Sequence, residues 1–492
     1  MRILEQLLTG VEYQVLQGNP GQEITGIAYD SRQVEEGNVF VCIPGFKTDG
    51  HNYAADAAKR GARSLLVERE VEGCAGCTIV QVKDTRWILP LLASRFYGRP
   101  SQNLRVVGVT GTNGKTTTTH LIAAILQEAG YAVGLVGTLN ASFRGYQEKL
   151  ANTTPESLDL ERFMRRVSDE GGRYVVMEVS SHALDLGRVS EIDFSAAVFT
   201  NLSQDHLDFH RNLDDYREAK LKLFRSLPVD SGRFAVINAD DPQARSFIDA
   251  APGDSVTYGI NNPAAVRAVN IQITSRGSSF EVLYPEGSMS LRIRLAGLFN
   301  VYNALAAIAF ALREGIPVRV ITGALEKVQG VAGRFETIDE GQEFSVVVDY
   351  AHTPDGLENI LKTARQITEG RIITVFGAGG DRDRTKRPLM GKIAAENSDF
   401  SILTSDNPRN EEPLAIIEDI VAGLKEIEDA HYAVVPDRRE AIRHAVYLAH
   451  PGDMVVIAGK GHEDYQIIKG KVYPFDDRLV AREYIRERIK DE

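Results

Sequence analysis

Short apolar runs alternate with amphipathic stretches along most of the chain, which is the pattern of α/β folds. In the first hundred residues, strands are expected at 23–29, 39–43, 64–67 and 78–82. A helix from Ala54 to Arg60, ended by Gly61, separates the second strand from the third. Polar loops follow the first two strands, at 30–32 and 44–51. Because α/β folds bind ligands past strand ends, both loops are candidate binding segments, with ordinary turns as an equal alternative.

The central part of the chain opens with a strand, a glycine-rich turn and a helix. An apolar run at 105–110 leads into a helical pattern that continues to Leu126. The turn between them and the start of the helix read Gly111-Thr112-Asn113-Gly114-Lys115-Thr116-Thr117. Glycines let backbone N–H groups turn toward phosphate oxygens, and the helix N-terminus favours an anion. We therefore predict a phosphate-binding loop.

Two side chains of this loop carry the expected chemistry. Lys115 supplies a positive charge at the terminal phosphates, and Thr116 offers a hydroxyl to Mg²⁺. The spacing departs from the common G-x-x-x-x-G-K-[ST] pattern, because Val109 stands five residues before Gly114. A glycine-rich turn without a ligand is the weaker alternative, since Gly-Lys-Thr opens a helix directly after a strand of the buried type.

Two further apolar runs end in polar side chains that suit cation binding. The run at 173–177 ends in Glu178, and a carboxylate beside a phosphate loop typically holds Mg²⁺ directly or through water. The run at 196–200 leads into 201–210, where two carboxylates and two histidines, including His206, lie close together. This cluster suits a second cation, and a solvated acidic loop is the alternative.

A helical pattern then covers 216–224, where Lys220 lies at the edge of the apolar face. Taken alone, Lys220 is interpreted as a lysine that extends its ammonium group to solvent. A strand is expected at 234–237 and a β-rich stretch at 266–295. The helix that opens after Gly297 carries Asn300 and Asn303, whose amides suit either a helix cap or the edge of a purine.

The last third of the chain predicts a second parallel sheet with Rossmann-like winding. Its strands are expected at 345–348, 371–376, 400–404 and 453–458. Each is followed by a polar or glycine-rich loop, and these loops are expected to cluster at the carboxyl edge of the sheet. They combine the acceptors Asp406 and Glu463 with the donors Arg382 and Arg409. That set suits a zwitterion, and solvated loop charges are an equal alternative.

These patterns predict three α/β domains: a small N-terminal domain at 1–100, a central phosphate-loop domain with a parallel sheet at 101–332, and a Rossmann-like C-terminal domain at 333–492. A chain of 492 residues is too long for one core. Its net charge of −12 argues against non-specific binding to nucleic acid or to a membrane surface. No apolar run reaches transmembrane length, and no signal-peptide pattern opens the chain.

The three cysteines, Cys42, Cys74 and Cys77, suggest a reducing cytoplasm. The lone C-x-x-C pair at Cys74 and Cys77 has no second pair nearby. It is interpreted as part of an ordinary loop rather than as a zinc or redox site.

Several of these segments together resemble the Mur ligases, which build the peptide stem of bacterial cell-wall precursors. The motifs that carry the resemblance are 110–116, Glu178-Val-Ser-Ser-His182, 201–206, 297–303, 333–336 and Asp349-Tyr-Ala-His-Thr-Pro-Asp355. They cover the second and third domains, and the first domain matches more loosely. Within the family, Asp406-Asn407-Pro408-Arg409 is similar to the signature of members that add meso-diaminopimelate to UDP-N-acetylmuramoyl-L-alanyl-D-glutamate.

The resemblance implies an ATP-dependent amide ligase that acts through an acyl phosphate and releases ADP and phosphate. Lys115 and the loop amides would hold the phosphates. Thr116 and Glu178 would hold one Mg²⁺, and His206 the second. Lys220 would be carbamylated by CO₂, which turns a cation into an anion with hard oxygen ligands. The implied setting is cytoplasmic peptidoglycan synthesis, with its consequences for cell shape and division, and the expected form is a monomer without nucleic-acid or membrane partners.

The resemblance also implies three sets of contacts. For the nucleotide they are the loop residues from Gly111 to Thr117 with Asn303, Arg334 and Asp349. For the UDP precursor they are Ser31, Gly45, Phe46, Lys47, Asn152, Thr153, Thr154, Ser180 and Arg188. For diaminopimelate they are Arg382, Asp406, Asn407, Pro408, Arg409, Gly459 and Glu463. Leu186 departs from relatives that have Gln there, so that polar contact is absent or replaced.

Three alternatives stay open. A ligase for L-lysine keeps the chemistry, but lysine has no distal carboxylate for Arg409. A phosphate-loop switch or transport ATPase leaves the third-domain loops unexplained, and the chain has no Asn-Lys-x-Asp guanine motif. A folate-type polyglutamate ligase would lack the match at 406–409 and the UDP-binding first domain.

Overall fold

The structure is a computed structural model that describes residues 2–45, 48–206, 209–229, 232–274 and 277–491. It divides into two compact units. The first unit holds 1–108, 131–197 and 219–234, and the second holds 109–130, 198–218 and 235–492. Within the described ranges, no helix has both the length and the apolar character that a membrane span requires.

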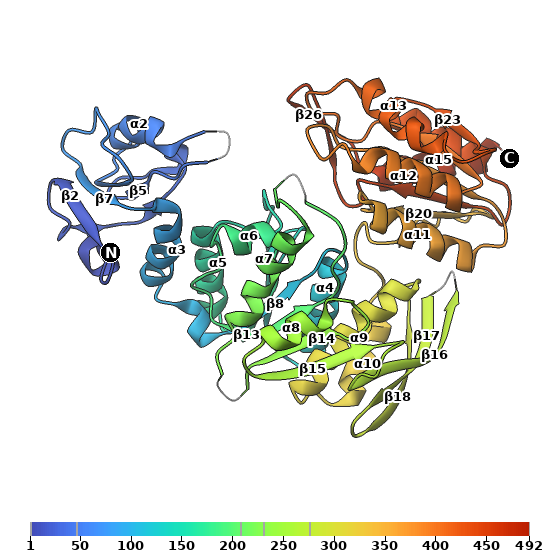
Figure 1. The fold of residues 1–492 in the computed structure, drawn as a ribbon, viewed down its shortest axis with the longest axis horizontal. Helices are drawn as coiled ribbons and strands as arrows, with labels where there is room; N and C mark the ends of the chain where they lie inside the picture. Colours follow the sequence, from blue (N-terminus) through green and yellow to red (C-terminus); the bar gives the residue numbers. More distant parts are fainter. Residues whose placement is uncertain (1, 46–47, 207–208, 230–231, 275–276, 492) are drawn as a thin grey trace. The chain divides into compact units, whose positions relative to one another are not determined.

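The first unit begins with a five-stranded sheet in the order β2-β7-β6-β5-β4 (Figure 1). Its strands are β2 (Tyr13–Gln17), β7 (Thr78–Val82), β6 (Ser64–Val67), β5 (Val39–Val41) and β4 (Ile27–Ala28). One face packs Leu66 and Val80 against α1 (Leu4–Leu7) and α3 (Thr85–Phe96). The other face packs Phe40 and Leu65 against α2 (Ala54–Lys59). The predicted strands at 64–67 and 78–82 and the predicted helix are confirmed.

The single strand predicted at 23–29 is wrong. The segment forms β3 (Glu23–Ile24), which pairs antiparallel with β1 (Arg2–Ile3), and then β4, which pairs parallel with β5. The chain turns at Gly26, where a Cβ atom would lie 2.8 Å from the amide nitrogen of Asn38. That amide donates to Thr25 Oγ1 at 3.2 Å, so a side chain distant in sequence fixes the turn.

The remainder of the first unit carries the strands β9 (Val133–Val136), β10 (Ala141–Phe143), β11 (Tyr146–Glu148) and β12 (Tyr174–Glu178). β9 pairs parallel with β12 and antiparallel with β10. The helices are α5 (Ser157–Asp169) and α6 (Ser181–Asp185), and α5 packs against α3. Short 3₁₀ turns lie at Ser31–Gln33, Gly50–Tyr53 and Pro100–Asn103.

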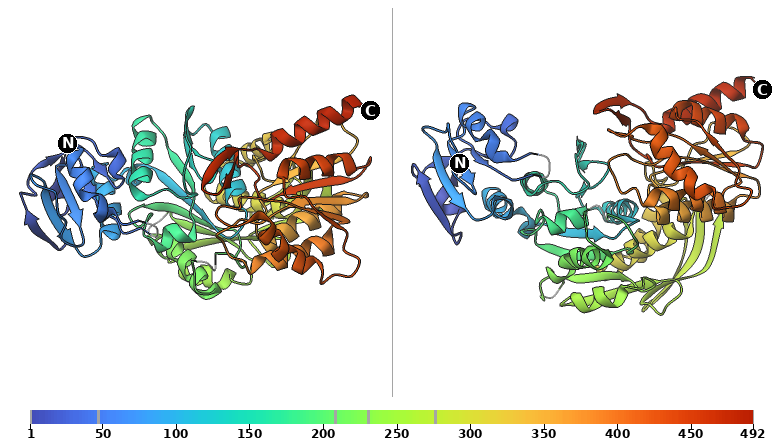
Figure 2. Two further views of the ribbon diagram at one scale, coloured as in Figure 1. Left: turned by 90° about the horizontal axis from the view of Figure 1, so that it is seen from above. Right: turned by 45° about the horizontal axis from the view of Figure 1, so that its top comes forward.

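The chain passes between the units inside four elements: β8 (Arg105–Thr110), β13 (Phe194–Phe199), β14 (Phe234–Asn238) and α7 (Leu213–Arg225). The three strands belong to an eleven-stranded sheet of order β11-β10-β9-β12-β8-β13-β14-β15-β16-β17-β18. In the second unit, β15 (Asp254–Gly259) pairs parallel with β16 (Val266–Thr274). β16, β17 (Gly277–Tyr284) and β18 (Gly287–Ile293) form the predicted β-rich stretch as an antiparallel ribbon (Figure 2).

Two helices of the second unit pack against the helix that follows the phosphate loop. α4 (Lys115–Glu128) packs against α9 (Leu298–Arg313) and α10 (Val318–Lys327). α8 (Ala244–Ala250) follows β14. The predicted helices at 216–224 and after Gly297 are confirmed.

The C-terminal part of the second unit is the predicted second sheet, with order β19-β20-β24-β21-β22-β23. Its strands are β19 (Glu336–Thr337), β20 (Ser345–Asp349), β21 (Ile372–Phe376), β22 (Phe400–Leu403), β23 (Tyr432–Val434) and β24 (Met454–Ala458). All neighbouring strands from β20 to β23 are parallel, and only β19 runs antiparallel. The prediction of a parallel, Rossmann-like sheet is therefore confirmed.

Helices cover both faces of this sheet (Figures 1 and 2). Leu357, Met390 and Ile420 bring α11 (Pro354–Ile367), α12 (Lys386–Asn397) and α13 (Pro413–Leu424) onto one face. Ile442 and Ile485 bring α14 (Arg438–Leu448) and α15 (Asp477–Asp491) onto the other. A hairpin of β25 (Tyr465–Ile468) and β26 (Lys471–Pro474) follows β24.

One buried carboxyl group lies where α5 packs on α3. Glu161 of α5 is 1% exposed, and Ser94 of α3 is its hydrogen-bonding neighbour. Burial, with a smaller contribution from the nearby Glu191, raises the pKa of Glu161 to about 8. The folded protein therefore keeps this carboxyl group protonated at neutral pH.

We predict that this group makes the protein less stable as pH rises. The unfolded chain releases the proton of Glu161 near its ordinary pKa of 4.5, whereas the folded chain holds it until about 8. Stability is therefore full below pH 4.5 and falls as pH rises toward 8. Glu161→Gln should remove this loss and raise Tm at pH 8 by on the order of 3–6 °C, with little change at pH 4.5.

The measurement is calorimetry of the wild type, Glu161→Gln and the exposed control Glu5→Gln between pH 4.5 and 8. A Tm difference between Glu161→Gln and wild type that does not change with pH would contradict the prediction.

Candidate active site

The phosphate loop lies between the end of β8 and the first residue of α4, as predicted. Gly111 has φ of 149° and Gly114 has φ of 84°, conformations that side chains rarely adopt. A Cβ on Gly111 would lie 1.9 Å from Thr200 Oγ1, and one on Gly114 would lie 2.3 Å from Asn303 Oδ1. Glycine is therefore required at both positions, because Thr200 and Asn303 occupy the space that a side chain would need. This requirement accounts for the glycines although their spacing departs from the common pattern.

Side chains of the loop bind its own backbone and the backbone of Ser203. Lys115 Nζ donates to the carbonyl oxygens of Gly111 at 2.9 Å and Thr112 at 2.7 Å. Thr112 Oγ1 donates to the Ser203 carbonyl at 3.1 Å and accepts from the Ser203 amide at 3.0 Å. Thr117 is buried in the first turn of α4. The loop is therefore shaped in advance, with an ammonium group at its mouth.

Asn303 packs against this loop rather than capping α9. Its side chain is 5% exposed, and its amide nitrogen donates to Asn300 Oδ1 at 3.1 Å. Its oxygen accepts from Thr118 Oγ1 at 3.4 Å. The N-cap of α9 is Gly297, which offers no side chain. The capping alternative is therefore wrong, and contact with a purine stays a prediction.

Residues that follow the central domain reach the same loop. Arg334 Nη2 donates to Thr116 Oγ1 at 2.9 Å, and its guanidinium lies 4.6 Å from the centre of the Tyr350 ring. The Asp349 carboxylate accepts from the amides of Phe335 at 2.6 Å and Ala351 at 2.7 Å. Burial raises the pKa of Asp349, and the Arg334 charge opposes that effect. The structure thus brings the predicted Arg334 to the phosphate loop and Asp349 to Arg334.

Asp355 was only the last letter of a motif in the sequence, yet it contacts the phosphate loop. Its Oδ2 accepts from Asn113 Nδ2 at 2.6 Å and from Ser203 Oγ at 3.1 Å. It occupies the first turn of α11, where a carboxylate is favoured by the helix dipole. Its distance of 242 positions from Asn113 explains why the sequence pattern did not reveal the contact.

Acidic and basic side chains lie close together around Asp205 and His206. His206 Nε2 lies 3.3 Å from Asp205 Oδ2, and Lys386 Nζ donates to the His352 carbonyl at 2.9 Å. Burial lowers the pKa of His352 to about 4, and the Lys386 charge lowers it further, so this ring is neutral at pH 7. Burial alone raises the pKa of Asp205, but His206, His352 and Lys386 bring it below its usual value.

Of the two carboxylates and two histidines in the second predicted cation site, Asp208 lies outside the described residues. Asp205 and His206 are adjacent, whereas His210 packs against the Tyr216 ring at 5.2 Å between centroids. The described residues include no group of three or more His, Cys, Asp or Glu side chains placed to hold a metal.

Glu178 ends β12 in the first unit, where it is 1% exposed. Its Oε1 accepts from the Thr138 amide at 2.8 Å, and its Oε2 accepts from Thr138 Oγ1 at 3.1 Å. A Cβ on Gly137 would lie 2.3 Å from Oε1. The carboxylate is thus fixed in one orientation, as a metal ligand requires.

The segment after β11 holds Asn152, Thr153 and Thr154, three of the residues predicted to bind the UDP precursor, and Thr154 contacts two more, Ser180 and Arg188. Thr154 Oγ1 accepts from the Ser180 amide at 3.0 Å and lies 3.2 Å from Ser180 Oγ. Arg188 Nη1 donates to the Thr154 carbonyl at 3.0 Å. Thr153 Oγ1 lies 3.2 Å from Thr138 Oγ1. Asn152 is exposed beside them.

Glu156 and Arg86 join this group to the predicted uridine loop. Glu156 Oε1 pairs with Arg188 at 2.9 Å and with Arg86 at 3.7 Å. Arg86 Nη2 donates to the Pro44 carbonyl at 3.1 Å. Gly45 donates its amide to the Thr48 carbonyl at 2.9 Å. Neither Glu156 nor Arg86 was a predicted site residue, because each acts through contacts distant in sequence.

Three other predicted positions need separate mention. Ser31 begins a 3₁₀ turn that Asp30 caps, and it is half-buried. Phe46 and Lys47 lie outside the described residues. Lys220 of α7 is 1% exposed, so the interpretation that its ammonium extends to solvent is wrong.

The loops at the carboxyl edge of the C-terminal sheet meet as predicted. Arg409 Nη1 donates to the Gly380 carbonyl at 2.7 Å, and the Gly380 amide donates to the Asn407 carbonyl at 2.9 Å. A Cβ on Gly459 would lie 2.6 Å from Asp406 Oδ2. Pro408 is buried between Asn407 and Arg409. The segments 377–383, 405–409 and 459–464 therefore form one cluster.

Acceptors and donors in this cluster are electrostatically coupled. Burial and the neighbouring Arg382 charge lower the pKa of Arg409. Burial alone raises the pKa of Asp406, but Lys460 and Arg438 bring it below its usual value. The site thus presents two guanidiniums near a carboxylate that stays ionised.

Lys460 lies in one of the predicted loops, but the sequence did not mark it as a site residue. It is fully buried, with Nζ 3.0 Å from Glu463 Oε2 and 3.4 Å from Asn407 Oδ1. Asn407 Nδ2 also donates to Glu463 Oε2 at 2.8 Å. Glu463 is therefore held by two donors and points in one direction. A lysine between glycines gave no periodic signal that would have marked it as buried.

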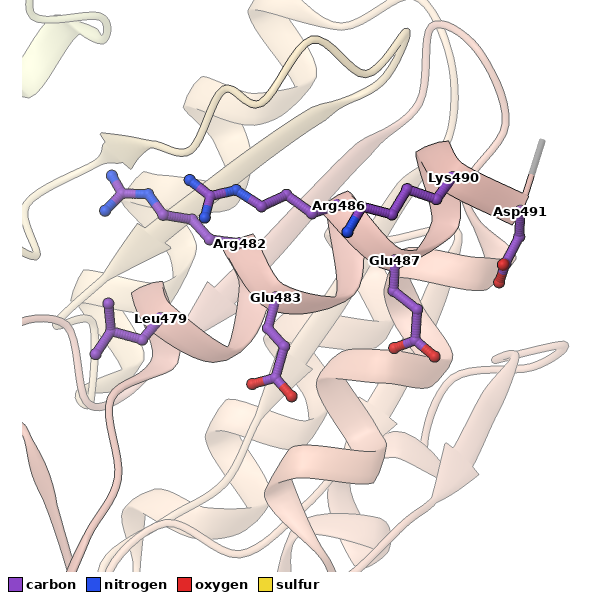
Figure 3. Close-up of a pocket in the computed structure, with 7 residues that line it drawn as sticks. All are labelled: Leu479, Arg482, Glu483, Arg486, Glu487, Lys490 and Asp491. Atoms are coloured by element: carbon purple, nitrogen blue, oxygen red, sulfur yellow. The ribbon is translucent and has the colours of Figure 1, made fainter.

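Two further features, a surface hollow and a pair of cysteines, are not assigned to the candidate active site. A surface hollow along α15 is lined by charged side chains (Figure 3). Arg482 and Arg486 pair with Glu340 at 3.3 and 2.7 Å, and Glu483 pairs with Arg439 at 2.8 Å, as on a solvated helix face. Cys74 and Cys77 are buried free thiols with raised pKa values, which agrees with their interpretation as loop residues.

Known proteins match this chain along nearly its whole length. "Mur ligase family, catalytic domain" matches residues 23–97, "Mur ligase middle domain" matches 109–311, and "Mur ligase, glutamate ligase domain" matches 333–461. A Syntrophomonas wolfei protein named UDP-N-acetylmuramoyl-L-alanyl-D-glutamate--2,6-diaminopimelate ligase is 53% identical over 487 residues, covering 99% of this chain and 100% of the relative. A Clostridium botulinum protein of the same name is 46% identical, covering 98% and 99%.

Solved structures of Mur ligases also match this chain over most of its length. A structure titled as a UDP-N-acetylmuramoyl-L-alanyl-D-glutamate--2,6-diaminopimelate ligase has a TM-score of 0.69 and 34% identity, covering 99% of both chains. The MurF ligase of Thermotoga maritima in complex with ADP shares the fold, with a TM-score of 0.67 at 18% identity over 94% of this chain and 98% of that one. The chain belongs to the Mur ligase family.

Proposed function

We propose that this chain uses ATP to join meso-diaminopimelate to UDP-N-acetylmuramoyl-L-alanyl-D-glutamate in the cytoplasm, during peptidoglycan precursor synthesis. The observation that carries the proposal is the pairing of Arg382 and Arg409 beside the ionised Asp406 and the fixed Glu463. Two guanidiniums suit a distal carboxylate, and two carboxylates suit a distal ammonium. The names of the relatives at 53% and 46% identity support the same substrate.

The chemistry is a phosphoryl transfer followed by an acyl transfer. The γ-phosphoryl group of ATP passes to the D-glutamate carboxylate, which gives an acyl phosphate. The amine of diaminopimelate attacks its carbonyl carbon, the C–N bond forms, and the C–O bond to phosphate breaks. Most of the acceleration comes from positioning and charge neutralisation. Lys115 and the loop amides bind phosphate oxygens, and Arg334 reaches the same place through Thr116.

The residues present fit Mg²⁺. The Thr116 hydroxyl and the fixed Glu178 carboxylate would hold one Mg²⁺, and His206 would hold a second, with a carbamate on the buried Lys220 as a further source of hard oxygen ligands. When bound, Mg²⁺ neutralises the charge of the transferred phosphate. Asn303 and Asp349 are proposed for the adenosine part of ATP.

The UDP precursor is proposed to bind along the first unit. Ser31 and residues 45–47 receive the uridine end. Residues 152–154, Ser180 and Arg188 receive the muramoyl-peptide, with Leu186 in place of a polar contact. The boundaries at 100 and 333, the monomeric state and the roles in cell shape and division are part of the same proposal.

The first test of this proposal is phosphate release with ATP and the UDP-muramoyl dipeptide. We expect strong stimulation by meso-diaminopimelate and little by L-lysine or by buffer, with a product heavier by one diaminopimelate residue. Stimulation by lysine would keep the ligase and overturn the role given to Arg409. Turnover that ignores every amino acid would contradict the proposed function.

A second prediction concerns Arg409. Arg409→Lys keeps the charge but loses the planar pair of donors that matches a carboxylate. We expect KM for meso-diaminopimelate to rise at least about tenfold while KM for ATP changes little. The measurement is steady-state kinetics with each substrate varied in turn. Equal loss for both substrates would indicate misfolding and contradict the assigned role.

A third prediction concerns Lys220. If it carries the carbamate, Lys220→Ala should be nearly inactive, and short carboxylates such as acetate should restore part of the activity, because they replace the lost oxygen ligands. Lys222→Ala is the matched control, since Lys222 lies two residues away on α7 and pairs with Asp185 at 2.7 Å at the surface. A fully active Lys220→Ala enzyme would contradict the carbamate.

A further inference from the structure

Backbone groups of residues 379–381, the segment that leads into Arg382, are held by side chains from neighbouring elements. We call this segment the arginine loop. The Gly379 carbonyl accepts from Arg387 Nη2 at 3.2 Å, and the Gly380 carbonyl accepts from Arg409 Nη1 at 2.7 Å. The Asp381 amide donates to Glu411 Oε1 at 2.6 Å. Arg387 and Glu411 therefore hold the backbone that immediately precedes Arg382.

Arg387 is the centre of this arrangement. It lies in the first turn of α12 and is 0% exposed. Its Nη2 and Nη1 bind Glu411 Oε1 at 2.8 Å and Oε2 at 2.9 Å, a bidentate pair, and Nη1 also binds Asp419 of α13 at 2.9 Å. A buried guanidinium with two carboxylate partners has one geometry, because any shift leaves a buried charge unsatisfied. Arg387 thus connects α12 to Asp419 of α13 and to the arginine loop.

The rigid support matters because it holds two like charges together. Arg382 and Arg409 are close enough that the charge of Arg382 lowers the pKa of Arg409. Arg409 also has φ of 52°, a backbone conformation that costs energy for a residue with a side chain. A Cβ on Gly379 would lie 2.8 Å from Arg409 Nη1, so the loop and Arg409 are in tight contact. Without support, repulsion would favour separation of the two guanidiniums.

We propose that Arg387 and Glu411 are positioning residues that set the selectivity of the ligase for an amino acid with a second carboxylate. They act on the substrate only through Arg382 and Arg409, whose backbone and side-chain positions they support. The inference rests on the proposed function, because it assigns a role within the same amino-acid pocket.

The test uses the full-length enzyme and two variants. Arg387→Lys keeps the buried charge but loses the bidentate geometry, and Glu411→Gln keeps the size but removes the negative charge. We expect KM for meso-diaminopimelate to rise at least about tenfold, while KM for ATP and for the UDP-muramoyl dipeptide stays within about twofold. The ratio of kcat/KM for meso-diaminopimelate to that for L-lysine should fall by a similar factor, because lysine never used the arginine pair.

Glu412→Gln is the matched control. Glu412 is the next residue along the chain, and its exposed side chain pairs only with Lys469 at 3.1 Å among the contacts of the described chain. It should leave every KM unchanged. Asp419→Asn is the milder variant if the first two fail to fold, because Arg387 keeps its bidentate partner. It should raise KM for meso-diaminopimelate by about two- to fivefold without affecting KM for ATP.

Two results would overturn the inference. One is a folded variant whose KM for meso-diaminopimelate and selectivity over lysine match the wild type. The other is a rise of all three KM values in the same proportion, which is what a merely structural role produces. Failure of the proposed function is distinguishable, because it would appear in the wild type as turnover without dependence on meso-diaminopimelate.

Discussion

The site depends on backbone approach that only glycine permits. Gly111 and Gly114 turn the chain after β8 with positive φ, and neighbouring side chains occupy the space where their Cβ atoms would be. Those neighbours are Thr200 and Asn303, which come from other strands and helices. The same close approach lets backbone amides face a phosphate and lets α4 begin immediately after the turn. The turn, the start of α4 and the side chains of Thr200 and Asn303 that pack against the glycines therefore depend on one another.

The C-terminal sheet uses the same constraint for a different ligand. Gly380 and Gly459 lie where any side chain would collide, at 1.9 Å from the Pro408 carbonyl and 2.6 Å from Asp406 Oδ2. The loops can then interlock at the carboxyl edge, and their charged side chains converge. Convergence has an electrostatic cost, which the buried pairs Lys460–Glu463 and Arg387–Glu411 offset. The charged side chains around the pocket therefore pair with one another rather than with water.

Much of the fold followed from local pattern. Apolar runs of four to six residues located β6, β7, β20, β21 and β24, because a strand buried on both faces has no polar alternation to obscure it. The prediction of one strand at 23–29 was wrong because the interruption depends on Asn38, which lies outside the segment and whose side chain binds Thr25. β2 and α3 were not predicted, and α3 contains Pro90, which local rules disfavour inside a helix.

The sequence by itself determined the residue types of the site: a glycine-rich turn before Lys115, a carboxylate at a strand end, and arginines and acids in loops after parallel strands. These follow from short spacing and strand direction, which are local properties. Only the tertiary structure decided that Lys220 is buried, that Asp355 binds Asn113, and that Arg387 supports the loop before Arg382. Burial and contacts between residues hundreds of positions apart depend on how helices and sheets pack, and no short window of sequence carries that information.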